Sequence, residues 1–316
     1  ITEMGVGDAF RVDLENDVIR PAVITHQGEI LPPPPRKDPS PAAAQAAVTA
    51  TDDSGRQVVL ARTPERIVSL APGATEMLFA AGAGERVIAT VEYSDEPPAA
   101  RRVPRIGDSS AVDIERLVAL RPDVVVIWPR GGNPSQIEKV ARLGFPLYHQ
   151  QADALADLPD SLRRLGALAN TRDTAEQAAR EIETRLAQLA SRYSRTGRVP
   201  VFLQIWDRPV YTVGGTHLMS DALTLCGARN VFSDLREPAL AVDIEAVIAR
   251  NPEVIVAVAP PGVAGGWLAD WRRFPDLKAV RHGRLVAFED QRLSRLGPSA
   301  VEGAAALCEA LDAVIG

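Results

Sequence analysis

One pattern of residues occurs twice in this chain, in copies that begin at Asp113 and at Asp243. Each Asp-Ile-Glu triplet is followed, at identical spacing, by Ala, Pro and two Val residues (Ala119, Pro122, Val124, Val126 and Ala249, Pro252, Val254, Val256). Asp is a common helix N-cap residue and Pro disfavours helix continuation, so each copy predicts a two-turn helix and then a buried strand. Common helix–strand patterns could produce part of this match by chance, but we favour an internal repeat and therefore two similar lobes.

From residue 57 onward, short apolar runs alternate with segments of helical periodicity. We expect strands at residues 66–70, 87–90, 124–127, near 147, 199–203 and 254–257, and helices at residues 74–81, 114–120, 135–143, 218–226 and 300–315. This alternation is typical of a mostly parallel sheet with helices on both faces. The predicted fold class is α/β, with two Rossmann-like lobes built on central parallel sheets.

A longer helix is predicted in the middle of the chain. Thr174 and Gln177 fit a capping box, and apolar residues at spacings of three and four continue to Tyr193. Twenty residues span roughly 30 Å, so this helix could join two lobes rigidly, and the alternative is one more crossover helix. We favour one long backbone helix between the lobes.

The predicted division of the chain has four parts. A Pro-rich N-terminal extension covers residues 1–55, where residues 10–24 could add a strand. The N-terminal lobe covers 56–152, the linker with the long helix 153–197, and the C-terminal lobe 198–316.

Composition excludes some classes of protein. The chain is 46% hydrophobic and 24% charged, which is typical of a globular protein. Its net charge of −6 argues against a nucleic-acid partner, because phosphate binding requires a basic surface. No apolar run of about 18 residues is present that could span a membrane. The chain starts at Ile1 without signal-peptide features, so we expect a processed product.

Signatures of enzymes are also missing from the sequence. It contains no GxSxG, GxxxxGK[ST] or HExxH pattern. The four histidines lie far apart without the spacing of metal ligands. We therefore expect a binding protein that is not an enzyme and has no metal site of its own.

Aromatic residues follow the predicted strands in both halves of the chain. Tyr93 and Trp128 follow strands of the first half, and Trp206 and Tyr211 follow the first strand of the second. Because ligands of open α/β sheets bind at the carboxyl ends of the strands, we expect these loops to converge on a cleft. Aromatic walls with few charges suit a large, flat, partly apolar ligand, although packing alone could explain any one of these residues.

Two further pairs of residues have alternative readings. Glu115 and Glu245 occupy equivalent positions early in the repeated helices, where the helix N-terminus stabilises a carboxylate. They could equally form one acidic contact on each lobe for a two-fold partner with basic pockets. The cysteines, Cys226 and Cys308, are either buried free thiols or a disulfide pair, and their spacing does not decide between these.

Several segments resemble the vitamin B12-binding proteins of bacterial ABC importers, in the helical-backbone metal receptor class of solute-binding proteins. The resemblance extends from about residue 64 to the end of the chain. Its main segments are residues 72–76 (PGATE), 93–98 (YSDEPP), 114–123 (IERLVALRPD), 128–133 (WPRGGN), 201–204 (VFLQ) and 209–212 (PVYT).

The resemblance implies an extracytoplasmic, periplasmic protein that captures cobalamin or a related corrinoid between its lobes and delivers it to the permease dimer of an ABC importer. It implies a monomer without an intrinsic cofactor, since the cobalamin is the transported ligand. The implied ligand-binding residues are Pro72, Tyr93, Trp128, Gly132, Trp206, Tyr211, Asp290 and Arg295. Glu115 and Glu245 match the docking glutamates of the family, and Cys226 and Cys308 match its disulfide.

The sequence also departs from the family pattern. Residues 107–110 stand where the family has one tryptophan, Ala239 stands where it has another, and the final ligand loop at 290–295 is one residue longer. These departures leave the identity of the corrinoid open. A ferric-siderophore or heme receptor of the same fold is the nearer alternative, and an α/β enzyme or a corrinoid sensor is more distant.

Overall fold

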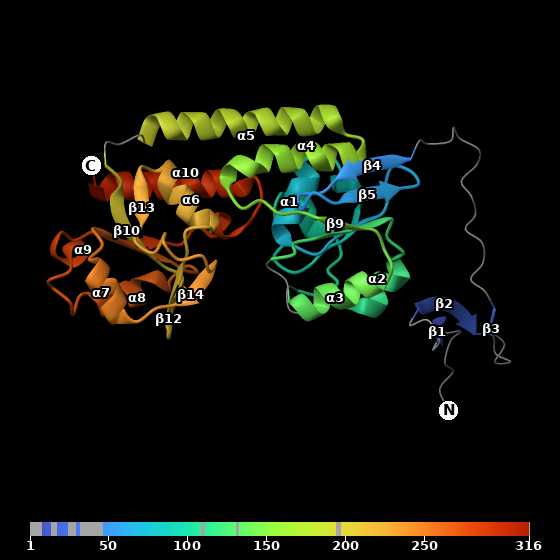
Figure 1. Cartoon of the computed structure of the whole chain (residues 1–316), viewed down its shortest axis with the longest axis horizontal. Coiled ribbons are helices and arrows are strands. Elements are labelled where there is room, and N and C mark those ends of the chain that lie inside the picture. The colour runs from blue at the N-terminus through green and yellow to red at the C-terminus, as the bar shows by residue number, and fades with distance from the viewer. Residues whose placement is uncertain are drawn as a thin grey trace.

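The computed structural model of the protein describes residues 8–13, 18–24, 30–31, 47–108, 111–130, 133–193 and 197–315. Figure 1 shows two lobes side by side, with helix α5 (Arg172–Tyr193) running along the top of both. In the N-terminal extension, β1 (Asp8–Asp13), β2 (Val18–Ile24) and β3 (Ile30–Leu31) form an antiparallel sheet. Within the described ranges, no helix combines the length and apolar character that a membrane span requires.

The N-terminal lobe is built on a four-stranded parallel sheet in the order β7-β6-β8-β9. Its strands are β6 (Ile67–Ser69), β7 (Val87–Ala89), β8 (Val124–Ile127) and β9 (Leu147–His149). Its helices are α1 (Pro72–Ala80), α2 (Ile114–Leu120) and α3 (Pro134–Arg142), with 3₁₀ turns η1 (Gly84–Arg86) and η2 (Pro98–Arg102). All four residues of β8 are buried, as expected for a strand covered on both faces.

An antiparallel hairpin of β4 (Val48–Thr51) and β5 (Gln57–Leu60) precedes this sheet. Ala50, Val58 and Leu60 from the hairpin are buried in the main core. The boundary proposed after residue 55 falls in the turn between these paired strands.

The C-terminal lobe repeats the arrangement, with parallel strands in the order β13-β10-β15-β16. These are β10 (Val199–Gln204), β13 (Ala228–Asn230), β15 (Val254–Val258) and β16 (Leu285–Phe288). Its helices are α6 (Leu218–Leu225), α7 (Ile244–Arg250), α8 (Ala264–Trp271), α9 (Lys278–Arg281) and α10 (Ser299–Ile315). A small antiparallel sheet adds β11 (Trp206–Asp207), β12 (Val210–Val213) and β14 (Ala239–Ala241).

The repeated sequence folds twice in the same way. Helices α2 and α7 each end at a residue in the left-handed conformation, Arg121 (φ 45°) and Asn251 (φ 41°), directly before the repeated proline. Asp113 caps α2 by accepting a hydrogen bond from the backbone N–H of Arg116 at 2.9 Å. Asp243 is likewise the N-cap of α7, but its side chain makes no capping hydrogen bond, and its carbonyl accepts from the backbone N–H groups of Ala246 and Val247.

The linker between the lobes holds η3 (Leu155–Asp157), α4 (Leu158–Ala169) and α5. The capping box predicted at Thr174 and Gln177 is wrong. Helix α4 ends at Asn170 in the left-handed conformation, and the chain turns so tightly that α5 already begins at Arg172. Thr174 therefore lies inside the helix, and the amide of Gln177 donates to Glu181 at 3.0 Å.

Helix α5 contacts both lobes. It is therefore the helix that joins them, not one more crossover helix within a lobe. At its start, the hydroxyl of Thr171 donates to the carbonyl of Ala81 in the N-terminal lobe. Further along, Arg185 pairs with Glu302 of α10 in the C-terminal lobe at 2.9 Å. One cluster of buried apolar residues continues from α1 through α4 and α5 to α6 and α10, so the lobes share a core on this side.

Candidate functional site

The first turn of α1 brings the two lobes into contact. Pro72 occupies the start of this helix, where its missing N–H costs nothing. A Cβ added to Gly73 would lie 2.6 Å from the carbonyl oxygen of Leu296 in the C-terminal lobe. Only glycine permits this approach of backbone to backbone.

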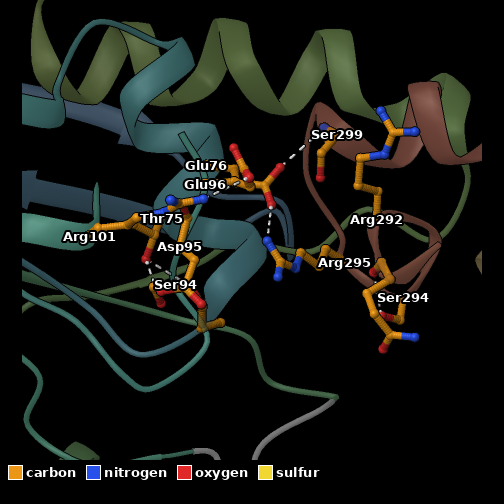
Figure 2. Close-up of polar contacts among 12 residues, drawn as sticks. Thr75, Glu76, Ser94, Asp95, Glu96, Arg101, Arg292, Ser294, Arg295 and Ser299 are labelled. Atoms are coloured by element: carbon orange, nitrogen blue, oxygen red, sulfur yellow. Dashed lines mark hydrogen bonds and ion pairs between the residues drawn. The ribbon is translucent and has the colours of Figure 1, made fainter. Parts of the chain in front are cut away.

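One turn further along α1, the buried carboxylate of Glu76 crosses to the C-terminal lobe (Figure 2). It accepts a hydrogen bond from the backbone N–H of Ser299 at 3.1 Å, and Arg295 lies 3.7 Å from its other oxygen. A Cβ on Gly297 would lie 2.7 Å from the same carboxylate. Burial raises the pKa of Glu76 above its usual value, although the hydrogen bond from Ser299 and the charge of Arg295 act in the opposite direction.

Beside this contact, a pocket of about 520 Å³ opens between the lobes. The N-terminal lobe contributes the β6–α1 turn and residues that follow strands of its sheet, and the C-terminal lobe contributes the loop before α10. The lining residues are Ala71, Pro72, Gly73, Ala74, Tyr93, Trp128, Gln150, Pro260, Gln291, Ser294, Arg295 and Leu296. Four predicted ligand-binding residues thus lie together: Pro72, Tyr93, Trp128 and Arg295.

Tyr93 lies on a loop whose backbone is firmly held. Buried hydroxyl groups of Thr75, Thr90 and Ser94 hydrogen-bond to one another beneath it. Arg105 donates to the carbonyl of Ser94 at 2.8 Å. Tyr93 itself has a φ of 64° and is 73% exposed. A left-handed conformation is costly for a bulky residue, and such strain concentrates at functional sites.

Trp128 directly follows β8 and is half-buried against the main core. Gln150 directly follows the neighbouring strand β9, and its backbone N–H donates to the carbonyl of Ile127 at 2.9 Å. The sheet therefore places both residues at its carboxyl edge, as expected for the ligand-facing edge of an α/β sheet. Gly132 lies outside the described residues.

Trp206 and Tyr211 do not line this pocket. They pair across the β11–β12 hairpin of the C-terminal lobe. Trp206 is 55% exposed and packs edge-to-face on Trp267, with ring centroids 6.2 Å apart. The sequence located both aromatic residues after a strand but did not predict the hairpin that carries them.

Asp290 is also outside the pocket lining, although it belongs to the same loop as Arg295. Its carboxylate caps η4 (Gln291–Ser294) by accepting from the backbone N–H of Arg292 at 3.0 Å. The hydrogen bond from the Arg292 side chain lowers the pKa of Asp290. Asp290 therefore shapes the loop that presents Gln291, Ser294 and Arg295.

The family model for a periplasmic binding protein matches residues 67–291, which include both sheets and most of this pocket. The chain belongs to the periplasmic binding protein family. Its curated relatives include vitamin B12-binding proteins of two bacteria. That of Vibrio parahaemolyticus is 32% identical over 250 residues, covering 79% of this chain and 90% of the relative. That of Pectobacterium carotovorum is 33% identical over 256 residues, covering 79% and 90%.

Solved structures agree with the fold of this periplasmic binding protein. The periplasmic vitamin B12-binding protein of Vibrio cholerae matches with a TM-score of 0.72 and 32% identity, over 80% of this chain and 98% of that one. A periplasmic heme-binding protein from a Roseiflexus species matches with a TM-score of 0.65 and 26% identity, over 79% and 99%. The same fold therefore serves proteins named for different tetrapyrrole ligands.

The predicted disulfide is confirmed, since Cys226 at the end of α6 is bonded to Cys308 in α10. Glu115 and Glu245 are both exposed in the first turns of α2 and α7. Figure 1 shows these two helices, one on each lobe, on the side of the molecule away from α5.

Sequence reasoning missed several residues of the site. Gln150, Pro260, Gln291, Ser294 and Leu296 line the pocket without having been predicted. Gln150 and Pro260 follow strands β9 and β15 closely, which is the signal that located Trp128. Glu76 offered no signal as an inter-lobe residue, because its partners Arg295 and Ser299 lie more than 200 positions further along the chain.

Proposed function

We propose that this chain is the extracytoplasmic solute-binding protein of an ABC importer, which captures cobalamin or a related corrinoid between its lobes and delivers it to the permease. The observation that carries this proposal is the inter-lobe pocket, where Tyr93 and Trp128 of one lobe face Arg295 of the other. The chain that folds around it is 32% identical to vitamin B12-binding proteins over 90% of a relative. The protein catalyses no reaction, acts in the periplasm as a monomer, and receives its cobalt inside the ligand.

Tyr93 and Trp128 would pack against the corrin ring, and Pro72 and Gly132 would contact its edge. A pocket of about 520 Å³ holds only part of a corrinoid, so the ligand would extend beyond it. The exposed Trp206 and the neighbouring Tyr211 would cover that extended part. Arg295 would bind polar side chains of the ring, in a loop shaped by Asp290.

Delivery requires contact with the permease, and Glu115 and Glu245 are the proposed docking residues. Both carboxylates are exposed, and they occupy equivalent positions of the two lobes. A permease dimer related by two-fold symmetry would offer one basic site to each of them.

Calorimetric titration of the purified protein with cyanocobalamin, cobinamide and hemin tests the proposal. We expect saturable binding of the corrinoids at a stoichiometry of one, and weaker binding of hemin. Replacing Trp128 by Ala should weaken corrinoid binding by about tenfold or more, because an aromatic contact is lost from the pocket. Tight binding of hemin or an iron chelate, without corrinoid binding, would instead assign the chain to the siderophore or heme receptors.

A further inference from the structure

A buried amide without a partner lines the inter-lobe pocket. The side chain of Gln150 exposes none of its surface, and neither its Oε1 nor its Nε2 has a hydrogen-bond partner among the described residues. Buried polar groups in proteins are almost always hydrogen-bonded, because an unmade bond costs the full desolvation of the group. Gln150 is therefore an exception that calls for a functional explanation.

The position of Gln150 is fixed by the sheet. Its backbone N–H donates to Ile127, so the residue extends the β8–β9 pairing beside Trp128. It lines the same pocket as Tyr93, Trp128 and Arg295. Since its amide is shielded from water, a ligand group can reach it only when the inter-lobe pocket widens. That ligand group is then fully removed from water as well.

The other amide and the cation among the residues that line the pocket already have partners. The amide Nε2 of Gln291 donates to the carbonyl of Ala259 at 3.0 Å. Arg295 faces the carboxylate of Glu76. Gln150 thus offers a neutral donor and a neutral acceptor side by side, whereas the cation among the lining residues is held beside an anion.

We propose that Gln150 is a specificity residue that pairs with an uncharged carboxamide on the edge of the ligand. This inference rests on the proposed function and deepens it, because it selects corrinoids with amidated side chains over tetrapyrroles with carboxylates. A primary carboxamide satisfies both Oε1 and Nε2 of Gln150. A carboxylate can accept a hydrogen bond from Nε2 but has no proton to donate to Oε1. The carboxylate oxygens and Oε1 therefore repel each other, and no free cation among the lining residues compensates.

The test compares two ligands with the same ring, dicyanocobinamide with carboxamide side chains and dicyanocobyrinic acid with carboxylates. Binding of each is measured by calorimetry for the wild type, for Gln150→Leu and for the control Gln151→Leu. The amide of Gln151 already donates to Asp153 at 3.1 Å. Unfolding of each ligand-free variant in urea separates binding from folding.

We expect the wild type to prefer dicyanocobinamide by at least tenfold. Gln150→Leu should lose about tenfold or more of its affinity for dicyanocobinamide, and should unfold no more readily than the wild type, because leucine removes an unpaired buried amide. Gln151→Leu should keep the wild-type preference. If Gln150→Leu bound both ligands with wild-type affinity, this inference would be overturned and the proposed function would stay intact. A buried water molecule would then be the hydrogen-bond partner of the Gln150 amide. A wild type that binds neither ligand would overturn the proposed function and this inference together.

Discussion

At the scale of single residues, several wholly or partly buried polar side chains respond to pH in opposite directions. His217 is the N-cap of α6, where its Nδ1 accepts a hydrogen bond from the backbone N–H of Met219 at 3.1 Å. Burial lowers the pKa of His217 from 6.5 to about 4. Its neutral form therefore contributes stability that is complete above pH 6.5, is lost progressively as the pH falls below that value, and is fully lost once the pH has fallen through about 4.

We predict that His217→Asn makes the protein less sensitive to acid. Asparagine keeps the capping acceptor but does not titrate, so it removes a loss of roughly 3 kcal/mol that protonation of the buried imidazole would cause. Urea unfolding at pH 7 and pH 4.5 measures this, with the exposed His282→Asn as the control. Burial raises the pKa of Asp53, Glu76 and Asp221, so these carboxyl groups stabilise the folded protein as the pH falls. They are present in both proteins, so the difference in free energy of unfolding between variant and wild type reports on His217 alone. An equal loss of stability in both proteins would contradict the prediction.

At the scale of secondary-structure elements, local signals decide what the sequence can predict. Helix α2 and strand β8 lie at the predicted residues, because Asp113 caps the helix and Pro122 follows its end. Helix α4 was missed, since it follows the 3₁₀ turn η3 without a break and its N-cap Asp157 makes no side-chain capping bond. The unpredicted turn at Asn170 is also the reason that the start of α5 was placed three residues too late, at residue 175 instead of Arg172.

For the candidate site too, local sequence patterns predicted some residues and could not predict others. Strand ends located Tyr93 and Trp128, because the carboxyl edge of a parallel sheet follows from local sequence. Sequence could not tell that Trp206 and Tyr211 share a hairpin, nor that the amide of Gln150 has no partner in the described part of the chain. Both depend on tertiary contacts that no local pattern encodes.

The repeated helices α2 and α7 lead to a prediction about docking. We expect the double variant Glu115→Lys, Glu245→Lys to lose at least about tenfold in affinity for its permease dimer in nanodiscs, because each lysine would face a basic site. Its calorimetric affinity for cyanocobalamin should stay unchanged, since neither residue lines the pocket. The control Asp173→Lys, Glu181→Lys makes the same change of charge on α5, on the opposite side of the molecule. Equal permease binding by both double variants would remove the two glutamates from the docking surface.

At the scale of the whole molecule, the lobes are joined differently at the two ends of their interface. Near α5 they share one apolar core, and Arg185 of α5 pairs with Glu302 of α10. At the pocket they meet through close backbone contacts and the buried carboxylate of Glu76. A shared core resists sliding, so we expect ligand entry to widen the slot by a small rotation about the α5 side rather than by a wide hinge motion.

This arrangement predicts the effect of Gly73→Ala. The new Cβ would lie 2.6 Å from the carbonyl oxygen of Leu296, so the loop before α10 must move away from α1. Overpacking of this kind costs about 1–3 kcal/mol, and the displaced loop carries Arg295 out of register with Tyr93 and Trp128. We therefore expect a lower free energy of unfolding in urea and an affinity for cyanocobalamin about tenfold lower by calorimetry.

The matched control is Gly265→Ala in α8, where an added Cβ has no atom within 4 Å and should be tolerated. Small-angle scattering of ligand-free Gly73→Ala should show a slightly larger radius of gyration than the control, because the pocket side is wedged open while the α5 side is held. Wild-type affinity and wild-type scattering in Gly73→Ala would mean that the contact between α1 and Leu296 does not set the width of the slot. Another contact between the lobes would then have to limit their rotation about the α5 side.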